Sequence, residues 1–205
     1  MTLVSEENGA PRRRKNDPAG VRGRILDAAF SLFQEQGYTA TSVHEIARGA
    51  RVTAGALHHH FATKKSLGLA VVEERVSQAL DGTWLQPLRS GSDAREAVLS
   101  LFQSLANELD QQGSVRGCPV NNLALELSFQ DAEFRSALAG IFSRWRVVLA
   151  HALGSEPEAE RLATLLIASY SGAMALAKVE QRGAPLRSCA NELGRLLGRE
   201  GKAPA

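Results

Sequence analysis

The sequence lacks the features of an exported or membrane-spanning protein. Its 205 residues include two cysteines, Cys118 and Cys189, too few for the disulfide framework of a small secreted domain. No apolar run approaches the ~20 residues that cross a bilayer, and the amino terminus has no apolar signal core. Since free thiols suit a reducing compartment, we expect a cytoplasmic protein without a membrane partner.

Motifs of enzymes and of metal sites are also missing. The chain has no Ser/His/Asp spacing, no glycine-rich phosphate loop and no paired metal-binding carboxylates. His58, His59 and His60 are consecutive, so on a helix they point about 100° apart and cannot converge on one metal ion. An enzyme is therefore a distant alternative, with Cys118 and the remote His151 as its thin support. We expect no metal and no cofactor.

The apolar residues follow a helical period along the chain, with no strand signal and no repeat of 20–50 residues. A hydrophobic content of 44% is ordinary for a chain that buries a core. The pattern predicts an all-α fold. The expected helices cover about 25–36, 43–50, 54–61, 64–80, 94–112, 119–128, 134–152, 162–181 and 186–197.

The segment 24–65 contains three short helix signals in succession. Gly37 ends the first helix, because glycine enters the left-handed region at low cost. Ser42 caps the second helix, and Glu45 three residues later completes a capping box. Thr53 caps the third helix after a tight turn. Two short helices joined in this way predict a helix-turn-helix.

This segment resembles the amino-terminal domain of the TetR family of one-component transcriptional repressors. The resemblance implies an all-α architecture of nine helices, with a three-helix helix-turn-helix domain followed by a helical-bundle regulatory domain. The positions that match the family pattern are Gly37, Tyr38, Thr41, Ser42, Val43, Ile46, Ala47, Val52, Thr53, Gly55, Leu57, His59, Phe61 and Lys64.

The chain departs from the family pattern at four positions. Arg51 stands where glycine is frequent in the turn, Ala54 stands where Lys or Arg is common, and His58 and His60 replace tyrosines. The resemblance implies that the third helix and its flanks bind operator DNA, with the small residues of the helix near base edges. The expected DNA-binding residues are Thr41, Ser42, Arg51, Thr53, Ala54, Gly55, Ala56, His58, His59, His60, Lys64 and Lys65.

Charge divides the chain in the same way. Residues 12–65 contain ten Lys or Arg against four Asp or Glu, near +6, so with a total of +2 the remainder is near −4. This asymmetry is typical of a DNA-binding domain joined to one that does not meet phosphate. We expect a disordered basic arm over 1–20, the DNA-binding domain over 21–66 and a ligand-binding and dimerisation domain over 67–200. The arm either enters the minor groove or adds non-specific attraction.

The regulatory half carries the expectations that the resemblance implies. The last two helices form a homodimer interface, which a palindromic operator requires. A small-molecule inducer of unknown identity binds between the fifth and eighth helices and favours a state that leaves the operator. The candidate ligand residues are Trp84, Phe102, Cys118, Asn121, Asn122, Phe142, Trp145, Tyr170 and Met174. Aromatic residues at helical spacing also suit a core, and the two Asn side chains also suit capping or packed polar contacts.

Cys118 supports an alternative mode of sensing. The run 116–123 is similar to a segment in a branch of the family that includes efflux-type and reactive-electrophile-responsive repressors. At a helix amino terminus near Arg116, a Cys118 thiolate would be favoured, which suits a redox or electrophile sensor. The other interpretation is a small buried apolar side chain. For coupling to DNA we expect the fourth helix alone to reach both sites.

Overall fold

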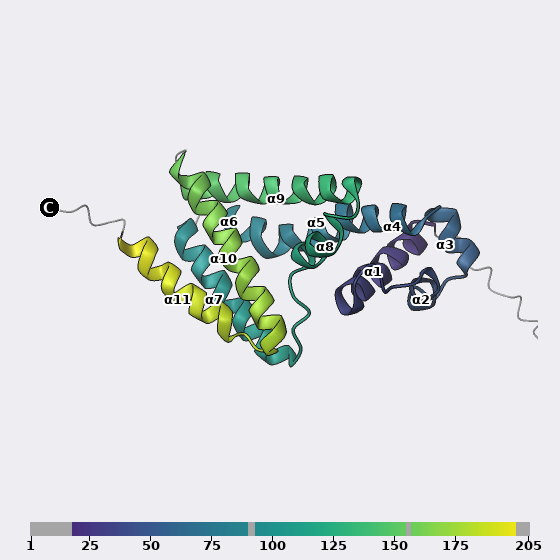
Figure 1. Ribbon diagram of the computed structural model, residues 1–205, viewed down its shortest axis with the longest axis horizontal. Coiled ribbons are helices and arrows are strands. Elements are labelled where there is room, and N and C mark those ends of the chain that lie inside the picture. The colour runs from purple at the N-terminus through teal and green to yellow at the C-terminus, as the bar shows by residue number, and fades with distance from the viewer. Residues whose placement is uncertain (1–17, 90–92, 155–156, 200–205) are drawn as a thin grey trace, which may run out of the picture.

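The computed structural model describes residues 18–89, 93–154 and 157–199 (Figure 1). The first three helices are α1 (Pro18–Gln36), α2 (Val43–Gly49) and α3 (Ala54–His60). Because α1 begins at Pro18, residues 18–20 are helical, and their placement in the disordered arm was wrong. The rest of the expected arm lies outside the described residues.

The predicted helix signals of this domain are confirmed. Ser42 and Glu45 form the capping box of α2, with the Ser42 backbone N–H donating to Glu45 Oε2 at 2.8 Å. The Thr53 hydroxyl accepts from the Ala56 backbone N–H at 3.1 Å at the start of α3. Gly37 ends α1 with a φ of +87°, a conformation that favours glycine.

The fourth helix is longer than the sequence pattern predicts. It comprises α4 (Lys64–Ala70), η1 (Val71–Val76), α5 (Ser77–Leu80), η2 (Asp81–Leu85) and α6 (Gln86–Arg89), of which η1 and η2 are π-helical. The backbone stays right-handed helical at every joint, so this is one continuous helix. The expected end near Asp81 and Gly82 is wrong, because the burial of Trp84 and Leu85 stabilises the turns that follow Gly82.

Five further helices complete the described part of the chain. They are α7 (Ala94–Gln112), α8 (Pro119–Leu127), α9 (Ala132–Leu153), α10 (Glu158–Glu180) and α11 (Ala184–Arg199). With α4 to α6 counted as one helix, the described residues form the nine helices that were predicted, and they contain no strand. The start of α10 lies four residues before the predicted position 162.

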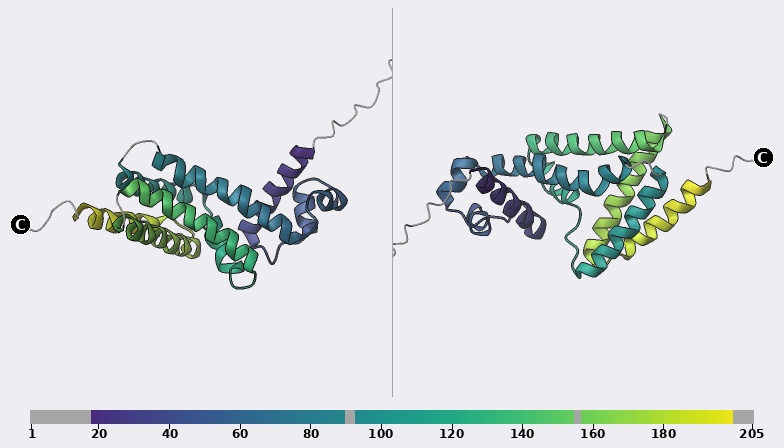
Figure 2. Two further views of the ribbon diagram at one scale, coloured as in Figure 1. Left: turned by 90° about the horizontal axis from the view of Figure 1, so that it is seen from above. Right: turned by 180° about the vertical axis from the view of Figure 1, so that it is seen from behind.

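The helices of the carboxyl-terminal part pack in two connected groups. α7, α10 and α11 lie side by side, and α9 runs along the fourth helix (Figures 1 and 2). α8 lies at the junction, in contact with α1, η1 and α9 (Figure 1). This arrangement places the short helix α8 between the amino-terminal domain and the carboxyl-terminal bundle.

Four aromatic side chains form the centre of the carboxyl-terminal core. Trp84, Phe102, Trp145 and Tyr170 are all buried. The ring centroids of Trp84 and Trp145 are 4.8 Å apart, and those of Trp84 and Tyr170 are 4.9 Å apart. Tilted and edge-on pairs at these distances are favourable beyond the area that they bury. The cluster joins the fourth helix to α7, α9 and α10.

α10 is the one described helix that could cross a membrane by length and composition. It packs against both α9 and α11 within the bundle. A core helix of a water-soluble protein passes the same test, so this helix by itself is weak support for a membrane span.

Candidate DNA interface and ligand cavity

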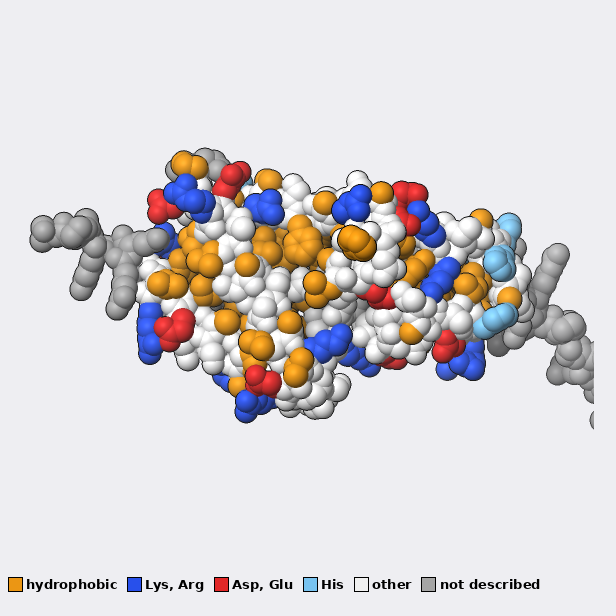
Figure 3. All heavy atoms as spheres, viewed as in Figure 1, with side chains coloured by type: hydrophobic (Ala, Val, Ile, Leu, Met, Phe, Trp, Pro, Cys, Tyr) orange, Lys and Arg blue, Asp and Glu red, His pale blue; other side chains and the backbone are white. Residues whose placement is uncertain are grey.

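The recognition helix α3 presents its polar and small residues at one end of the molecule. Leu57 is buried, whereas Ala54, Gly55, His58 and His59 are exposed. Histidine side chains accordingly mark this end in the space-filling view (Figure 3). Because the small residues carry little bulk, the amino-terminal turn of α3 can approach the floor of a major groove closely.

Thr41 and Lys65 are both already engaged within the protein, Thr41 by burial and Lys65 by ion pairs. Thr41 is 1% exposed, and its hydroxyl donates to the Gly37 carbonyl at 2.7 Å. The Lys65 ammonium lies 2.7 Å from Asp131 and 2.6 Å from Glu133, so two carboxylates already neutralise it. The buried Thr41 hydroxyl therefore holds a loop and is not presented to DNA. Lys65 joins the fourth helix to α9, and its contact with DNA stays a prediction.

Lys64 keeps the position that a phosphate contact requires. Its ammonium donates to the Thr39 carbonyl at 3.2 Å and lies 4.4 Å from the ring centroid of Tyr38. Partial burial lowers the pKa of Lys64, although the carboxylates of Glu126 and Glu45 oppose this change. A lysine carries three donors, so its contact with Thr39 leaves donors for DNA.

Arg51 occupies the turn between α2 and α3 with a φ of +55°. This is the left-handed region that glycine adopts without strain and that other residues adopt at a cost of roughly 1–2 kcal/mol. The chain therefore accepts a strained turn and gains an exposed guanidinium beside the recognition helix.

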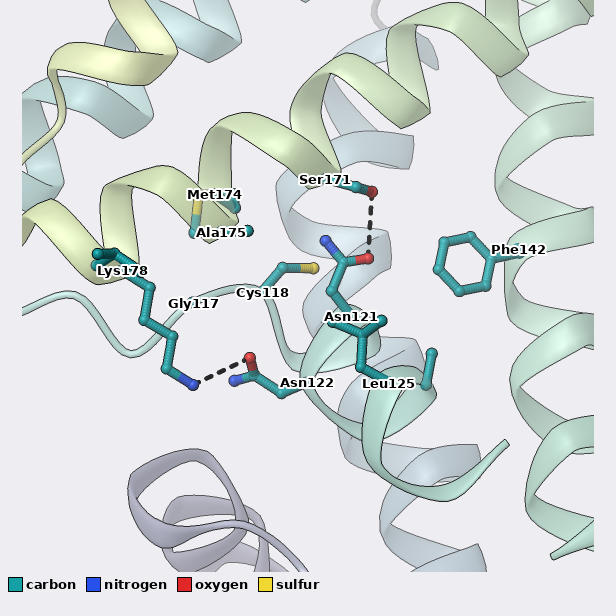
Figure 4. A pocket seen from close by; sticks show the side chains of 12 residues that line it. Gly117, Cys118, Asn121, Asn122, Leu125, Phe142, Ser171, Met174, Ala175 and Lys178 are labelled. Atoms are coloured by element: carbon teal, nitrogen blue, oxygen red, sulfur yellow. Dashed lines mark hydrogen bonds between the residues drawn. The ribbon is translucent and has the colours of Figure 1, made fainter. Parts of the chain in front are cut away.

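A cavity of about 570 Å³ lies between α8, α9 and α10 (Figure 4). Its residues point inward from three helices, which is the usual arrangement of a small-molecule site within a helical bundle. The mouth is apolar, because Leu125 and Val179 are each 84% exposed. The lining residues are Gly117, Cys118, Asn121, Asn122, Ala124, Leu125, Phe142, Ser171, Met174, Ala175, Lys178 and Val179.

The structure divides the candidate ligand residues into three groups. Cys118, Asn121, Asn122, Phe142 and Met174 line the large cavity. Trp84, Trp145 and Tyr170 line a smaller cavity of about 100 Å³, together with Cys118. Phe102 lines neither cavity and is 0% exposed, so it is a core residue in this structure and its contact with a ligand stays a prediction.

Ser171, Ala175 and Lys178 also line the cavity wall, although they are not among the residues predicted from the sequence. They share one face of α10 with Met174, since positions 171, 174, 175 and 178 recur at helical spacing. The helical spacing from Met174 is thus a sequence signal for these three residues. The contributions of Leu125 and Val179 were not readable, because only the packing of α8 against α9 and α10 brings them to one opening.

Cys118 lies between the two cavities with its thiol buried. Burial raises the pKa of the Cys118 thiol and outweighs the backbone N–H groups of α8, which favour the thiolate. Arg116 does not supply the expected positive charge, because its guanidinium lies 3.2 Å from Glu35. The prediction of a favoured thiolate is therefore wrong.

α8 connects the cavity to the DNA-binding domain directly. Glu126 accepts from the backbone N–H of Tyr38 at 2.9 Å and from that of Thr39 at 2.6 Å. Asn122, one turn earlier, donates to Gln34 Oε1 at 2.9 Å. Because α8 lines the cavity and holds the loop after α1, the fourth helix is not alone in reaching both sites.

The Glu126 carboxylate is well suited to this connection. Partial burial acts to raise its pKa, but hydrogen bonds from Thr39 and Tyr38 and the charge of Lys64 outweigh burial, so the pKa is lowered. The side chain is therefore ionised near neutral pH, and its bonds to backbone N–H groups are of the stronger, charge-assisted kind.

The fourth helix is tied to the same domain by ion pairs. Arg22 Nη1 donates to Glu74 Oε2 at 2.8 Å, and Arg75 Nε donates to Asp27 at 2.6 Å. Both pairs join α1 to η1, the π-helical part of the fourth helix. The DNA-binding domain is thus connected to the bundle through η1 as well as through α8.

Two family models match the chain. Residues 25–71 match the bacterial regulatory proteins of the tetR family, and residues 94–192 match the carboxyl-terminal domain of LmrA/YxaF-like transcriptional regulators. The transcriptional regulator AcuR of Cereibacter sphaeroides is 32% identical, over 95% of this chain and 96% of AcuR. The chain belongs to the TetR family.

Further relatives and solved structures agree with this assignment. The transcriptional repressor DhaR of a Mycobacterium species is 28% identical over 81% of this chain and 86% of DhaR. A regulatory protein TetR from Rhodobacter sphaeroides has a TM-score of 0.77 at 26% identity, over 85% of this chain and 97% of that chain. A TetR regulator from Chloroflexus aurantiacus shares the fold, with a TM-score of 0.78 at 24% identity, over 89% and 96% of the two chains.

The protein is therefore a DNA-binding transcriptional regulator of the TetR family, of the kind that acts as a repressor, and not an enzyme. The helix-turn-helix identified from the sequence lies within the matched segment 25–71. The cavity lies within the second matched segment, 94–192.

Proposed function

We propose that this TetR regulator is a homodimeric repressor that binds a palindromic operator and is released by a small-molecule inducer in the cavity between α8, α9 and α10. The observation that carries the proposal is the position of α8. Its residues line the cavity, and Glu126 of the same helix holds the loop after α1. An inducer that moves α8 therefore acts on the orientation of the DNA-binding domain.

The exposed face of α10 supports dimerisation. It carries Leu165, Leu176 and Val179, which are 47–84% exposed, next to the small residues Ala168 and Gly172. Such a face allows two helices to approach closely and removes apolar surface from water. The exposed residues of α11 are mostly polar and would form the rim of this interface.

We propose a division of labour between the two halves of the chain. Residues 21–66 bind DNA, residues 67–200 bind ligand and dimerise, and the basic residues before position 18 add attraction to phosphate. α3 and its flanks contact the operator through Ser42, Arg51, Thr53, the residues of α3 and Lys64. The protein acts in the cytoplasm, where its operator is.

Thiol sensing through Cys118 is the second candidate function, and it has less support. The repressor NemR of Escherichia coli is 26% identical over 85% of this chain and 92% of NemR, and a solved NemR structure is described as a reduced form. In this chain the Cys118 thiol is buried and its pKa is raised, which opposes reaction as a thiolate.

Selection of DNA by the full-length protein tests the repressor proposal. From a random duplex pool we expect enrichment of an inverted repeat whose half-sites lie about 10 base pairs apart, or a multiple of this, centre to centre. Each bound duplex should carry an even number of protomers. Enrichment of a single, non-repeated site, or binding by one protomer, would contradict a dimeric repressor.

Replacement of Glu126 by Ala tests the connection through α8. Hydrogen bonds to a charged group contribute about 1.5–3 kcal/mol, so amide exchange at Tyr38 and Thr39 should become about ten- to a hundredfold faster. Glu108→Ala on α7 is the matched control, because that carboxylate is exposed and bonds Gln112 within its own helix. Unchanged amide exchange rates at Tyr38 and Thr39 in the Glu126→Ala variant would show that Glu126 does not stabilise this loop.

A further inference from the structure

The large cavity has a strongly uneven distribution of charge. Of the described residues that line it, Lys178 alone is charged. Its ammonium donates to Asn122 Oδ1 at 3.3 Å, a neutral acceptor (Figure 4). None of the ion pairs in the described part of the chain includes Lys178. A positive charge thus stands at the edge of an apolar cavity without an anionic partner.

The stem of Lys178 passes close to the backbone of Gly117. Gly117, with a φ of +88°, lies so close that an added Cβ would be 2.9 Å from Asn122 Oδ1 and 3.1 Å from Lys178 Cδ. The backbone therefore leaves room for this lysine and this amide, and for nothing larger than hydrogen at position 117. The ammonium is positioned at the boundary between the apolar cavity and a second groove.

A second donor lies deeper in the cavity. Asn121 Oδ1 accepts from the Ser171 hydroxyl at 3.2 Å, which fixes the orientation of the amide (Figure 4). Asn121 Nδ2 is buried and has no hydrogen-bond partner within the described structure. A buried donor without an acceptor is costly, so a ligand that brings an acceptor to this position would remove that cost.

We infer that the ligand of this cavity is an amphipathic organic anion, with an apolar body against Leu125, Phe142 and Met174 and an anionic head group on Lys178. This inference rests on the proposed function of the cavity and adds the chemical class of its ligand. A cationic ligand would meet Lys178 without a compensating carboxylate on the cavity wall, which excludes basic compounds.

The same head group would act on the DNA-binding domain. Asn122 joins Lys178 to α1, because its Nδ2 donates to Gln34 Oε1 and to the Arg116 carbonyl, each at 2.9 Å. A polar groove of about 690 Å³ between α1 and α8 shares Asn122, Leu125 and Lys178 with the cavity. An anion that takes Lys178 from Asn122 therefore changes the contact that joins α10, α8 and α1.

A pair of fluorescent probes separates the head group from the apolar body. 1-Anilinonaphthalene-8-sulfonate has an apolar body and an anionic head, and N-phenyl-1-naphthylamine is the same molecule without the sulfonate. Each is titrated into the full chain. We expect Lys178→Met to weaken sulfonate binding about tenfold and to change binding of the neutral probe less than twofold. Lys178→Arg should keep the affinity for the sulfonate, because the charge remains.

A variant that fills the cavity tests the site itself. Ala175→Phe places a ring in the cavity from an exposed position of α10 and should weaken both probes about equally. If it weakens both, and Lys178→Met leaves the ratio of the two affinities unchanged, the inferred anion preference is wrong while the cavity stands. If neither probe binds the wild type, or Ala175→Phe changes neither affinity, the proposed ligand site fails together with the inference.

Discussion

Phe102→Ala should destabilise the protein by about 3–5 kcal/mol, because it leaves a large void in a close-packed core. The ring is 0% exposed, and its centroid lies 6.0 Å from that of Trp84 and 5.8 Å from that of Tyr170. Such a loss is a large fraction of the ~5–15 kcal/mol that holds a typical protein folded. Urea unfolding at a fixed protomer concentration measures it.

Phe129→Ala is the matched control for this loss. It makes the same chemical change at a side chain that is 97% exposed, so the free energy of unfolding should change by about 0.5 kcal/mol or less. The opposite pattern would be a Phe102 variant that loses little stability but binds a cavity probe less tightly. That pattern would place Phe102 on the wall of the ligand site, as the family resemblance implies.

Gly55→Glu should weaken operator binding at least about a hundredfold. Gly55 is exposed in the first turn of α3. In the proposed complex with DNA, a carboxylate there faces phosphates and base edges in each half of the dimer. Like charges brought together at an interface cost several kcal/mol. Folding should persist, since an acidic residue near a helix amino terminus is favourable. Fluorescence anisotropy with the selected operator measures the affinity.

Two variants isolate the charge at Gly55. Gly55→Ala adds a Cβ whose nearest neighbour is Thr53 Oγ1 at 4.0 Å, so it should keep most of the affinity. Gly82→Glu adds the same charge at an exposed position of the fourth helix with nothing within 4 Å, and should leave operator binding near the wild-type value. Equal losses for Gly55→Glu and Gly82→Glu would mean that net charge, and not the position on α3, decides the affinity.

The carboxyl-terminal bundle illustrates a limit of reasoning from helical period. Phe102 and Phe142 both occupy the apolar stripes of their helices, yet Phe102 is sealed in the core and Phe142 lines the cavity. The period identifies which face turns inward. The helical period does not indicate whether the neighbouring helices cover that face completely. The cover depends on the angles at which those helices cross and on the side chains that they contribute.

Lys64 and Lys65 show the same limit for charge. The two adjacent lysines look equivalent in the sequence, and both were expected at phosphate. Lys65 is paired with Asp131 and Glu133, which lie more than sixty positions further along the chain. Lys64 instead donates to the Thr39 carbonyl and lies near the Tyr38 ring. Glu126 and Glu45 act on its charge, but no ion pair in the described part of the chain includes Lys64. The position of a residue along a helix sets the direction of its side chain. The groups that this side chain meets belong to distant segments of the chain.

The sequence by itself determined the helical fold, the helix-turn-helix and the family, because caps, helical periods and a short motif are local signals. Ser42 with Glu45, Thr53 and Gly37 act as those signals predict. The tertiary structure decided the contacts between the DNA-binding domain and the carboxyl-terminal bundle. Glu126 accepts hydrogen bonds from Tyr38 and Thr39, which lie far from it in the chain. Asn122 joins Lys178 to Gln34 over a similar separation. Cys118 is buried by side chains from distant segments. Contacts of this kind follow from the packing of whole helices, which no local pattern encodes.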